Sequence, residues 1–170
     1  MDLNHPLTIA TTGDDILTLT AEPVTVFDDK LRALADSMLS TMLSANGVGI
    51  AATQVFSRAA MFIMASNPNE RYPDAPAMSP TVVINPKILS TSAATEAGIE
   101  GCLSILGKRL SILRHSQIEV QYQSLDGQWQ QQMLHGFVAR IFQHEYDHLQ
   151  GITLLERIHL MTPQPEVMPC

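Results

Sequence analysis

The sequence has little of what a secreted, membrane-spanning or nucleic-acid-binding protein needs. It contains two cysteines, Cys102 and Cys170, the second at the very end of the chain, so a disulfide framework is not expected and a reducing, cytoplasmic location is favoured. No apolar run approaches the roughly 18 residues of a membrane span, and the N-terminus lacks the basic and apolar regions of a secretory signal. The ten Lys and Arg residues are scattered and are outnumbered by 17 Asp and Glu residues, which argues against a dedicated nucleic-acid binder.

What is present predicts one globular domain. A chain of 170 residues with 45% hydrophobic residues can bury one sizeable core, so residues 1–170 are expected to form a single catalytic domain, with an irregular tail at 161–170. Apolar periodicity predicts helices at 27–45 and 136–150. Strand-like segments lie between them, which indicates an α+β fold with antiparallel sheet packed around the second helix. The expected strands cover residues 58–65, 81–89, 115–123 and 128–134.

The second predicted helix carries the stretch "QHEYDHLQG" at 143–151. At about 100° per residue, His144, Glu145 and His148 share one flank, above Phe137 and Ile141, and therefore project from the apolar face. Two buried imidazoles can bind a metal ion while the glutamate between them acts as a general base. The polar residues of this helix, predicted to form a separate stripe, are Arg140, Gln143 and Asp147.

Two histidines do not complete a metal site, and these residues alone do not identify the third ligand. The metzincin pattern would place a histidine at position 154, which is Leu154, so that class is excluded. A thermolysin-like site would use a downstream glutamate, and the candidates are Glu156, close behind the helix, and Glu166 in the proline-rich tail. The other candidate is Cys102, because a thiolate and two imidazoles suit Fe(II) or Zn²⁺.

A glycine-rich stretch, "GVGIAATQ" at 47–54, is the third feature. Gly47, Gly49 and Ala52 match the dinucleotide fingerprint, but that fingerprint follows a strand and here follows a predicted helix, so a Rossmann site is rejected. The glycines instead indicate that the backbone passes close to a bound substrate. Gln54, at the end of the stretch, offers a neutral N–H donor.

Read together and in this order, "GVGIAATQ", "EGCLS" and "QHEYDHLQG" resemble the three signature motifs of the peptide deformylases. The linking segment "KRLSILRHSQIEVQYQSLDG" is also similar to the family's sequence between its second and third motifs. The resemblance covers residues 20–158, and three motifs with matching spacing are far more specific than any one of them. It implies a metal-dependent hydrolase that removes the formyl group from N-formylmethionyl peptides and releases formate.

The resemblance also implies a role for each motif residue. It gives Cys102, His144 and His148 as ligands of one divalent metal ion per chain, natively Fe(II), with Zn²⁺ or Ni²⁺ as substitutes. It gives Glu145 as the general base that later protonates the leaving amine. Gln54 and the backbone N–H of Leu103 match the groups that stabilise the oxyanion. The residues expected to bind the peptide are Val48, Gly49, Arg109, Phe137 and Ile141.

The expected partners follow from this activity: N-formylmethionyl peptides, met transiently at the ribosome. The chain departs from the family pattern after the cysteine, where Leu106 replaces a proline and Leu110 a small residue, and in "GDDILT" at 13–18. These departures suggest a divergent second copy of the enzyme. Two alternatives stay open at this point: a zincin-type metallopeptidase, and a non-catalytic relative that binds formyl peptides.

Overall fold

The computed structural model describes residues 6–161 and shows an α+β fold with antiparallel sheets, which confirms the predicted fold class. The irregular tail predicted for 161–170 lies outside the described residues, except for Met161. No helix in the described part of the chain is long and apolar enough to cross a membrane. The elements are η1 Asp15–Thr18, α1 Asp29–Ser44, β1 Gly49–Ala51, η2 Ala52–Val55, β2 Met61–Met64, β3 Thr81–Thr91, β4 Thr95–Cys102, β5 Ile105–His115, β6 Gln117–Gln123, β7 Trp129–His135, α2 Gly136–Leu149 and α3 Leu154–Met161.

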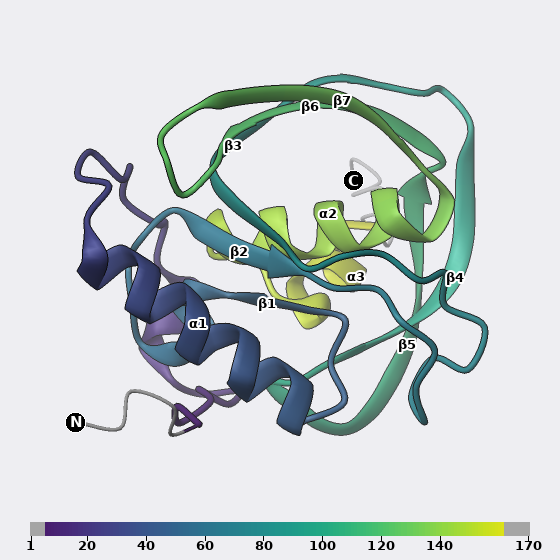
Figure 1. The fold of residues 1–170 in the computed structure, drawn as a ribbon. Coiled ribbons are helices and arrows are strands. Elements are labelled where there is room, and N and C mark those ends of the chain that lie inside the picture. The colour runs from purple at the N-terminus through teal and green to yellow at the C-terminus, as the bar shows by residue number, and fades with distance from the viewer. Residues whose placement is uncertain (1–5, 162–170) are drawn as a thin grey trace, which may run out of the picture.

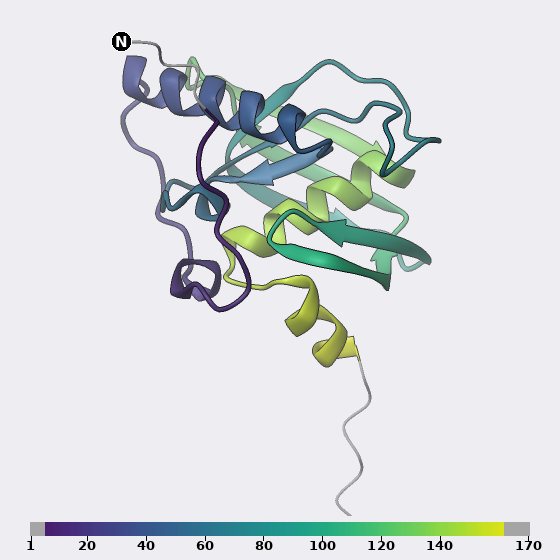
Figure 2. The same cartoon turned by 90° about the horizontal axis from the view of Figure 1, so that it is seen from below.

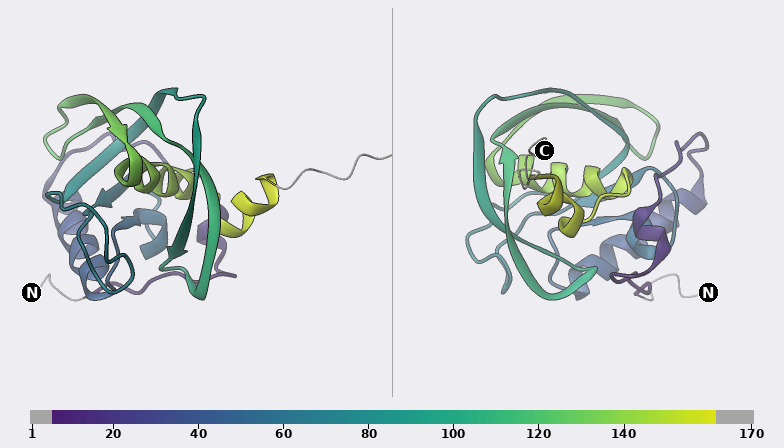
Figure 3. Two further views of the ribbon diagram at one scale, coloured as in Figure 1. Left: turned by 90° about the vertical axis from the view of Figure 1, so that its right-hand side faces the viewer. Right: turned by 180° about the vertical axis from the view of Figure 1, so that it is seen from behind.

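Within residues 6–161, seven strands form two sheets. The larger has the order β1-β2-β3-β6-β7 and the smaller is the β4–β5 hairpin, and every pairing between these strands is antiparallel. The register of β3 on β6 shifts between Ile84 and Lys87 and again between Ile88 and Ser90. Such irregularities bend a strand and increase its twist. Both views of Figure 3 show the strands from β3 to β7 curving around α2.

Strand β2 explains how the sheet can carry a helix on each face. Its side chains alternate between the two sides, and all four residues are buried. Phe62 and Met64 pack in the cluster that includes α2, whereas Met61 and Ile63 pack in the cluster that includes α1. Both faces are therefore apolar, and β1 and β2 lie between α1 and α2 (Figure 1).

Helix α2 occupies the centre of the molecule and contacts strands of both sheets. Its residues Ala139, Ile141 and Phe142 are buried against the larger sheet, and the Phe142 ring meets Phe62 edge-on with 5.0 Å between the ring centroids. A helix held on both sides by sheet is a rigid support for the side chains that it projects.

The β4–β5 hairpin and helix α3 were not predicted from the sequence. The hairpin lies beside α2, and α3 lies on the opposite side of the molecule from α1 (Figure 2). Leu154 of α3 is buried in a small cluster with Ile105, Ile112 and Cys102. Helix α3 therefore supports the hairpin close to the residue expected to bind metal.

Candidate metal centre

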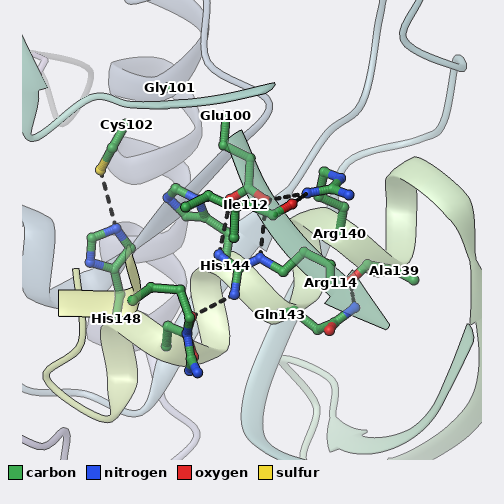
Figure 4. Close-up of polar contacts among 12 residues, drawn as sticks. Glu100, Gly101, Cys102, Ile112, Arg114, Ala139, Arg140, Gln143, His144 and His148 are labelled. Carbon is green, nitrogen blue, oxygen red and sulfur yellow. Dashed lines mark hydrogen bonds and ion pairs between the residues drawn. The ribbon is translucent and has the colours of Figure 1, made fainter. Parts of the chain in front are cut away.

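The two histidines of "QHEYDHLQG" lie one turn apart on α2, as their spacing predicts. The chain enters α2 at Gly136, whose φ of 57° turns it from β7 into the helix, a conformation that glycine adopts without strain. His144 and His148 are both buried, and their ring centroids are 5.1 Å apart. The HExxH face therefore points into the protein, toward the β4–β5 hairpin (Figure 4).

Cys102, the last residue of β4, completes a three-residue cluster with these histidines. Its Sγ lies 3.3 Å from His148 Nε2, and one donor atom from each of the three residues lies within 4.8 Å of the others (Figure 4). In the described part of the chain, these three residues are the cluster of soft donors able to hold a metal ion. One thiolate and two imidazoles fit Fe(II) or Zn²⁺.

The ionisation of Cys102 suits a metal ligand. Burial alone would raise the pKa of the thiol, but the nearby charge of His148 and a hydrogen bond with His144 lower that pKa well below its usual value. The thiolate is the form that binds metal, because the thiol is a poor ligand.

Glu100 orients the first histidine. It lies two residues before Cys102 on β4, so both side chains point to the same face of the strand. Its Oε1 is 2.9 Å from His144 Nδ1, and a carboxylate in this position accepts the Nδ1–H and leaves Nε2 free for a metal. Burial would raise the pKa of Glu100, but hydrogen bonds from His144 and Arg114 lower it to about 2.

A buried network of charges surrounds Glu100. Arg114 donates to both oxygens of Glu100, at 2.9 and 3.0 Å, and to Asp147 at 2.6 Å. Asp147 accepts further bonds from Arg157 of α3, and Arg140 donates to Glu100 at 2.7 Å. Arg140, Gln143 and Asp147, which the sequence groups as a polar stripe, are thus buried and paired rather than solvated. The network joins α2, β4, β5 and α3 behind His144.

We expect Arg114→Met to lower the free energy of unfolding by about 3–5 kcal/mol, because it leaves two buried carboxylates, Glu100 and Asp147, without a shared partner. Chemical denaturation of the purified variant measures this change. The matched control is Arg32→Met, which removes an arginine paired with Asp126 at the surface and should leave stability unchanged within error. Equal, small effects at both positions would show that the buried network does not stabilise the fold.

Glu145 faces the glycine-rich stretch across the cluster. A Cβ built on Gly49 would lie 2.9 Å from the carboxyl carbon of Glu145, so only glycine leaves room for this carboxylate. Its Oε2 is buried and has no protein partner among the described residues, and burial raises the pKa of the group. An unpaired carboxylate with a raised pKa, next to a cluster of metal-binding donors, is suited to accept a proton.

Gln54 has a fixed orientation in η2. Its Oε1 accepts a hydrogen bond from Ala51 N at 2.9 Å. Its Nε2 therefore points the other way, donating to Ser104 Oγ at 3.0 Å and lying 3.6 Å from Cys102 Sγ. The amide N–H donor is thus held beside the Cys102–His144–His148 cluster, on the wall of the pocket.

A pocket opens onto this cluster. The structure places most of the residues expected to bind peptide on its wall, but Arg109 instead lines an adjoining groove of about 490 Å³. Five residues that were not expected at the site also line the pocket: Glu100, Gly101 and Arg140, and Arg71 and Tyr72 from the long loop at 66–80. The expected residues on the pocket wall are Val48, Gly49, Gln54, Cys102, Leu103, Phe137, Ile141, His144 and Glu145.

Comparison with known proteins identifies the family. The model of the polypeptide deformylase family matches residues 6–164. The chain is 57% identical over 165 residues to peptide deformylase 2 of Shewanella oneidensis, which covers 97% of this chain and 90% of that protein. It is 49% identical over 133 residues to peptide deformylase 2 of a Nostoc species, covering 78% of this chain and 74% of that protein.

Solved structures agree with the sequence matches. A Met-Ala-Ser-bound class I type b peptide deformylase from Acinetobacter baumannii superposes with a TM-score of 0.88 at 46% identity, covering 91% of this chain and 99% of the other. The peptide deformylase of Thermotoga maritima gives a TM-score of 0.81 at 38% identity, covering 90% and 97%. The chain therefore belongs to the peptide deformylase family.

Proposed function

We propose that this protein hydrolyses the N-formyl group of N-formylmethionyl peptides and releases formate. The proposal is carried by one observation: a buried Cys102–His144–His148 cluster lies beside the unpaired carboxylate of Glu145, on the wall of a pocket. The alternatives find less support. Glu156, the zincin-type candidate within residues 6–161, already accepts hydrogen bonds from Thr153 N and Oγ1 at 2.6 Å. Each group proposed for catalysis is present, which argues against a binding-only relative.

In this proposal Cys102, His144 and His148 hold one divalent metal ion, as expected for a metal-dependent family. A bound divalent ion would lower the pKa of water and polarise the formyl carbonyl. We propose Fe(II) as the native metal, with Zn²⁺ or Ni²⁺ as substitutes, because a thiolate ligand softens the site. Glu100, which holds His144 by its Nδ1–H, keeps that ring correctly oriented while the ion is bound.

The protein's own groups then move the protons. Glu145 removes a proton from the attacking water and passes it to the amine as the C–N bond breaks, so that one carboxylate serves as base and then as acid. Gln54 Nε2 and the backbone N–H of Leu103 donate to the formyl oxygen as it gains negative charge. The fixed amide of Gln54 needs no reorganisation to do so.

The substrate is proposed to lie extended beside β1, with the backbone of Val48 and Gly49 as hydrogen-bonding partners. Phe137 and Ile141, which line the pocket, would surround the methionine side chain. Arg109 would contact the peptide further along, because it lines the adjoining groove that shares Cys102 and Leu103 with the pocket.

We also propose that residues 1–170 act as one catalytic domain, in the cytoplasm, and meet nascent chains transiently at the ribosome. The location and the encounter at the ribosome follow from the proposed substrate, because N-formylmethionine is found at the start of newly made chains.

Formate release tests the proposed function. Anaerobically prepared protein loaded with Fe(II) is mixed with formyl-Met-Ala-Ser, and formate and the free amine are measured. We expect stoichiometric production of both, and no cleavage of the internal peptide bonds. A metal-loaded protein that binds the peptide without releasing formate would support the binding-only alternative, and cleavage of internal bonds would support the peptidase.

Replacing the proposed oxyanion donor gives a further prediction. We expect Gln54→Ala to lower kcat by about 10²–10³-fold, because one preorganised donor is lost. The metal content should not change, since Gln54 is not a proposed ligand. The matched control is Ser104→Ala, which removes the hydroxyl next to Gln54 Nε2 but leaves its Oε1 held by Ala51 N, and should lower kcat far less. Equal losses would assign the effect to local packing.

A further inference from the structure

Arg140 is a buried arginine on the wall of the proposed methionine pocket. It lies on α2, one turn before His144, and is nine-tenths buried. A Cβ built on Gly98 of β4 would lie 2.6 Å from Arg140 Cζ, so the guanidinium fills the space above this glycine that a larger residue would occupy. Arg140 lines the pocket whereas Gly98 does not, which places the arginine between the strand and the pocket.

The guanidinium is held rigidly but is not fully paired. Its Nη1 donates to Glu100 Oε2 at 2.7 Å and to Ile112 O at 2.9 Å, and its Nη2 donates to Glu96 O at 2.7 Å (Figure 4 shows its place beside Glu100). An arginine has five N–H donors. Within residues 6–161, the Nε–H and one Nη2–H of Arg140 have no acceptor.

The surrounding network cannot supply that acceptor. Both oxygens of Glu100 already accept from Arg114, and one of them also from His144. Three guanidinium groups, those of Arg114, Arg140 and Arg157, share only two carboxylates, those of Glu100 and Asp147. The network therefore has one positive charge in excess, and an arginine cannot lose its proton. Arg140 has no atom among the buried side-chain atoms left without a partner, and it lines the pocket, so solvent reaches its free N–H groups. An acceptor on a bound side chain can take the place of that water and receive a charge-assisted hydrogen bond.

Unmodified methionine is a poor match for such a wall, because its thioether sulfur is only a weak acceptor. Oxidation adds a single strong acceptor oxygen to that sulfur without lengthening the side chain. The remaining carbon atoms would still meet Phe137 and Ile141. The first residue of a formylated chain is methionine, so its sulfoxide is the polar side chain that this pocket can encounter.

We propose that Arg140 makes this enzyme competent to deformylate peptides whose N-formylmethionine has been oxidised to the sulfoxide, by donating a hydrogen bond to the sulfoxide oxygen. The inference rests on the proposed function and extends its substrate class. The sulfur keeps its oxidation state throughout. Water adds to the formyl carbon, the C–N bond breaks, formate leaves, and the amine takes up a proton.

The test compares kcat/KM of the metal-loaded enzyme for three peptides: formyl-Met-Ala-Ser, the same peptide with methionine sulfoxide, and the same peptide with norleucine. We expect the sulfoxide peptide to be cleaved within about tenfold of the methionine peptide and at least as well as the norleucine peptide, since a charged donor is available to its oxygen. A preference for norleucine over the sulfoxide of about tenfold or more would overturn the proposal.

Variants then assign the effect. Arg140→Met should lower the sulfoxide-to-norleucine ratio by about tenfold or more, because it removes the donor from the wall. Arg114→Met, from the same network but outside the pocket, should lower both rates together and leave the ratio unchanged. An unchanged ratio in Arg140→Met would refute the assignment. If Arg140→Met does not fold, the sulfoxide-to-norleucine ratio of kcat/KM measured with the unmodified enzyme decides whether the proposal stands. Absence of activity on all three peptides would instead refute the proposed function.

Discussion

Glu145→Gln should lower kcat for formyl-Met-Ala-Ser by about 10²–10⁴-fold while the protein keeps its metal ion. The amide has the shape of the carboxylate but cannot accept the proton of the attacking water. Burial disfavours the charged form of Glu145 and raises its pKa, so replacing the carboxylate with a neutral amide should not lower the thermal midpoint. Formate release, metal content and thermal unfolding are measured on one preparation.

Three results together identify the base: low kcat, full metal content and an unchanged or higher thermal midpoint. A variant that kept kcat within about tenfold of the unmodified enzyme would show that another group accepts the proton. Loss of the metal would instead show that Glu145 helps to hold it, and the kinetic loss would then say nothing about proton transfer.

The second large effect is expected at Cys102. Cys102→Ala should reduce bound metal to about one-tenth of an equivalent or less, and formate release should fall with it, because two imidazoles alone hold a divalent ion weakly. The measurement is metal per chain after dialysis against a weak chelator. The buried position of Cys102 can accept alanine, so the apo variant should still fold, with a modest loss of stability from the small cavity.

Glu156→Ala is the matched control for the third ligand. It removes the carboxylate that caps α3 at Thr153, so it should cost about 1 kcal/mol of stability, but it should leave the metal content at one equivalent. The reverse pattern, with metal lost from Glu156→Ala and retained by Cys102→Ala, would restore the zincin-type reading.

The parts of the site that lie on one element were predictable from the sequence. The helical repeat alone places His144, Glu145 and His148 on one flank of α2. From the residues alone Cys102 was one of several candidates for the third ligand, and only the resemblance singled it out. No local rule brings the end of β4 to α2, 46 residues away from His148. The side-chain burial of Arg140 and Asp147 was also out of reach. Charged residues on a helix face normally meet water, and here their partners lie on the β4–β5 hairpin.

Helix α3 was missed although the sequence contains a signal for it. The stretch from Thr153 to Glu156 is a capping box, a helix-start pattern, and Glu156 does accept from the backbone N–H of Thr153. The eight-residue length of α3 gave too little periodicity to support it. Glu100 could likewise have been paired with Cys102, since residues two apart share one face of a strand, had the strand itself been recognised.

The proposed metal ligands are divided between β4 and α2, and this sets an order of events during synthesis. Cys102 leaves the ribosome before His148, and 46 positions separate them. At ordinary elongation rates of about 5–20 residues per second, that interval lasts about 2–9 s. Throughout it, the thiol has neither its two imidazoles nor the cover of α2, and is open to oxidants and to stray thiophilic ions. An enzyme proposed to act on new chains would thus be most vulnerable while it is itself a new chain.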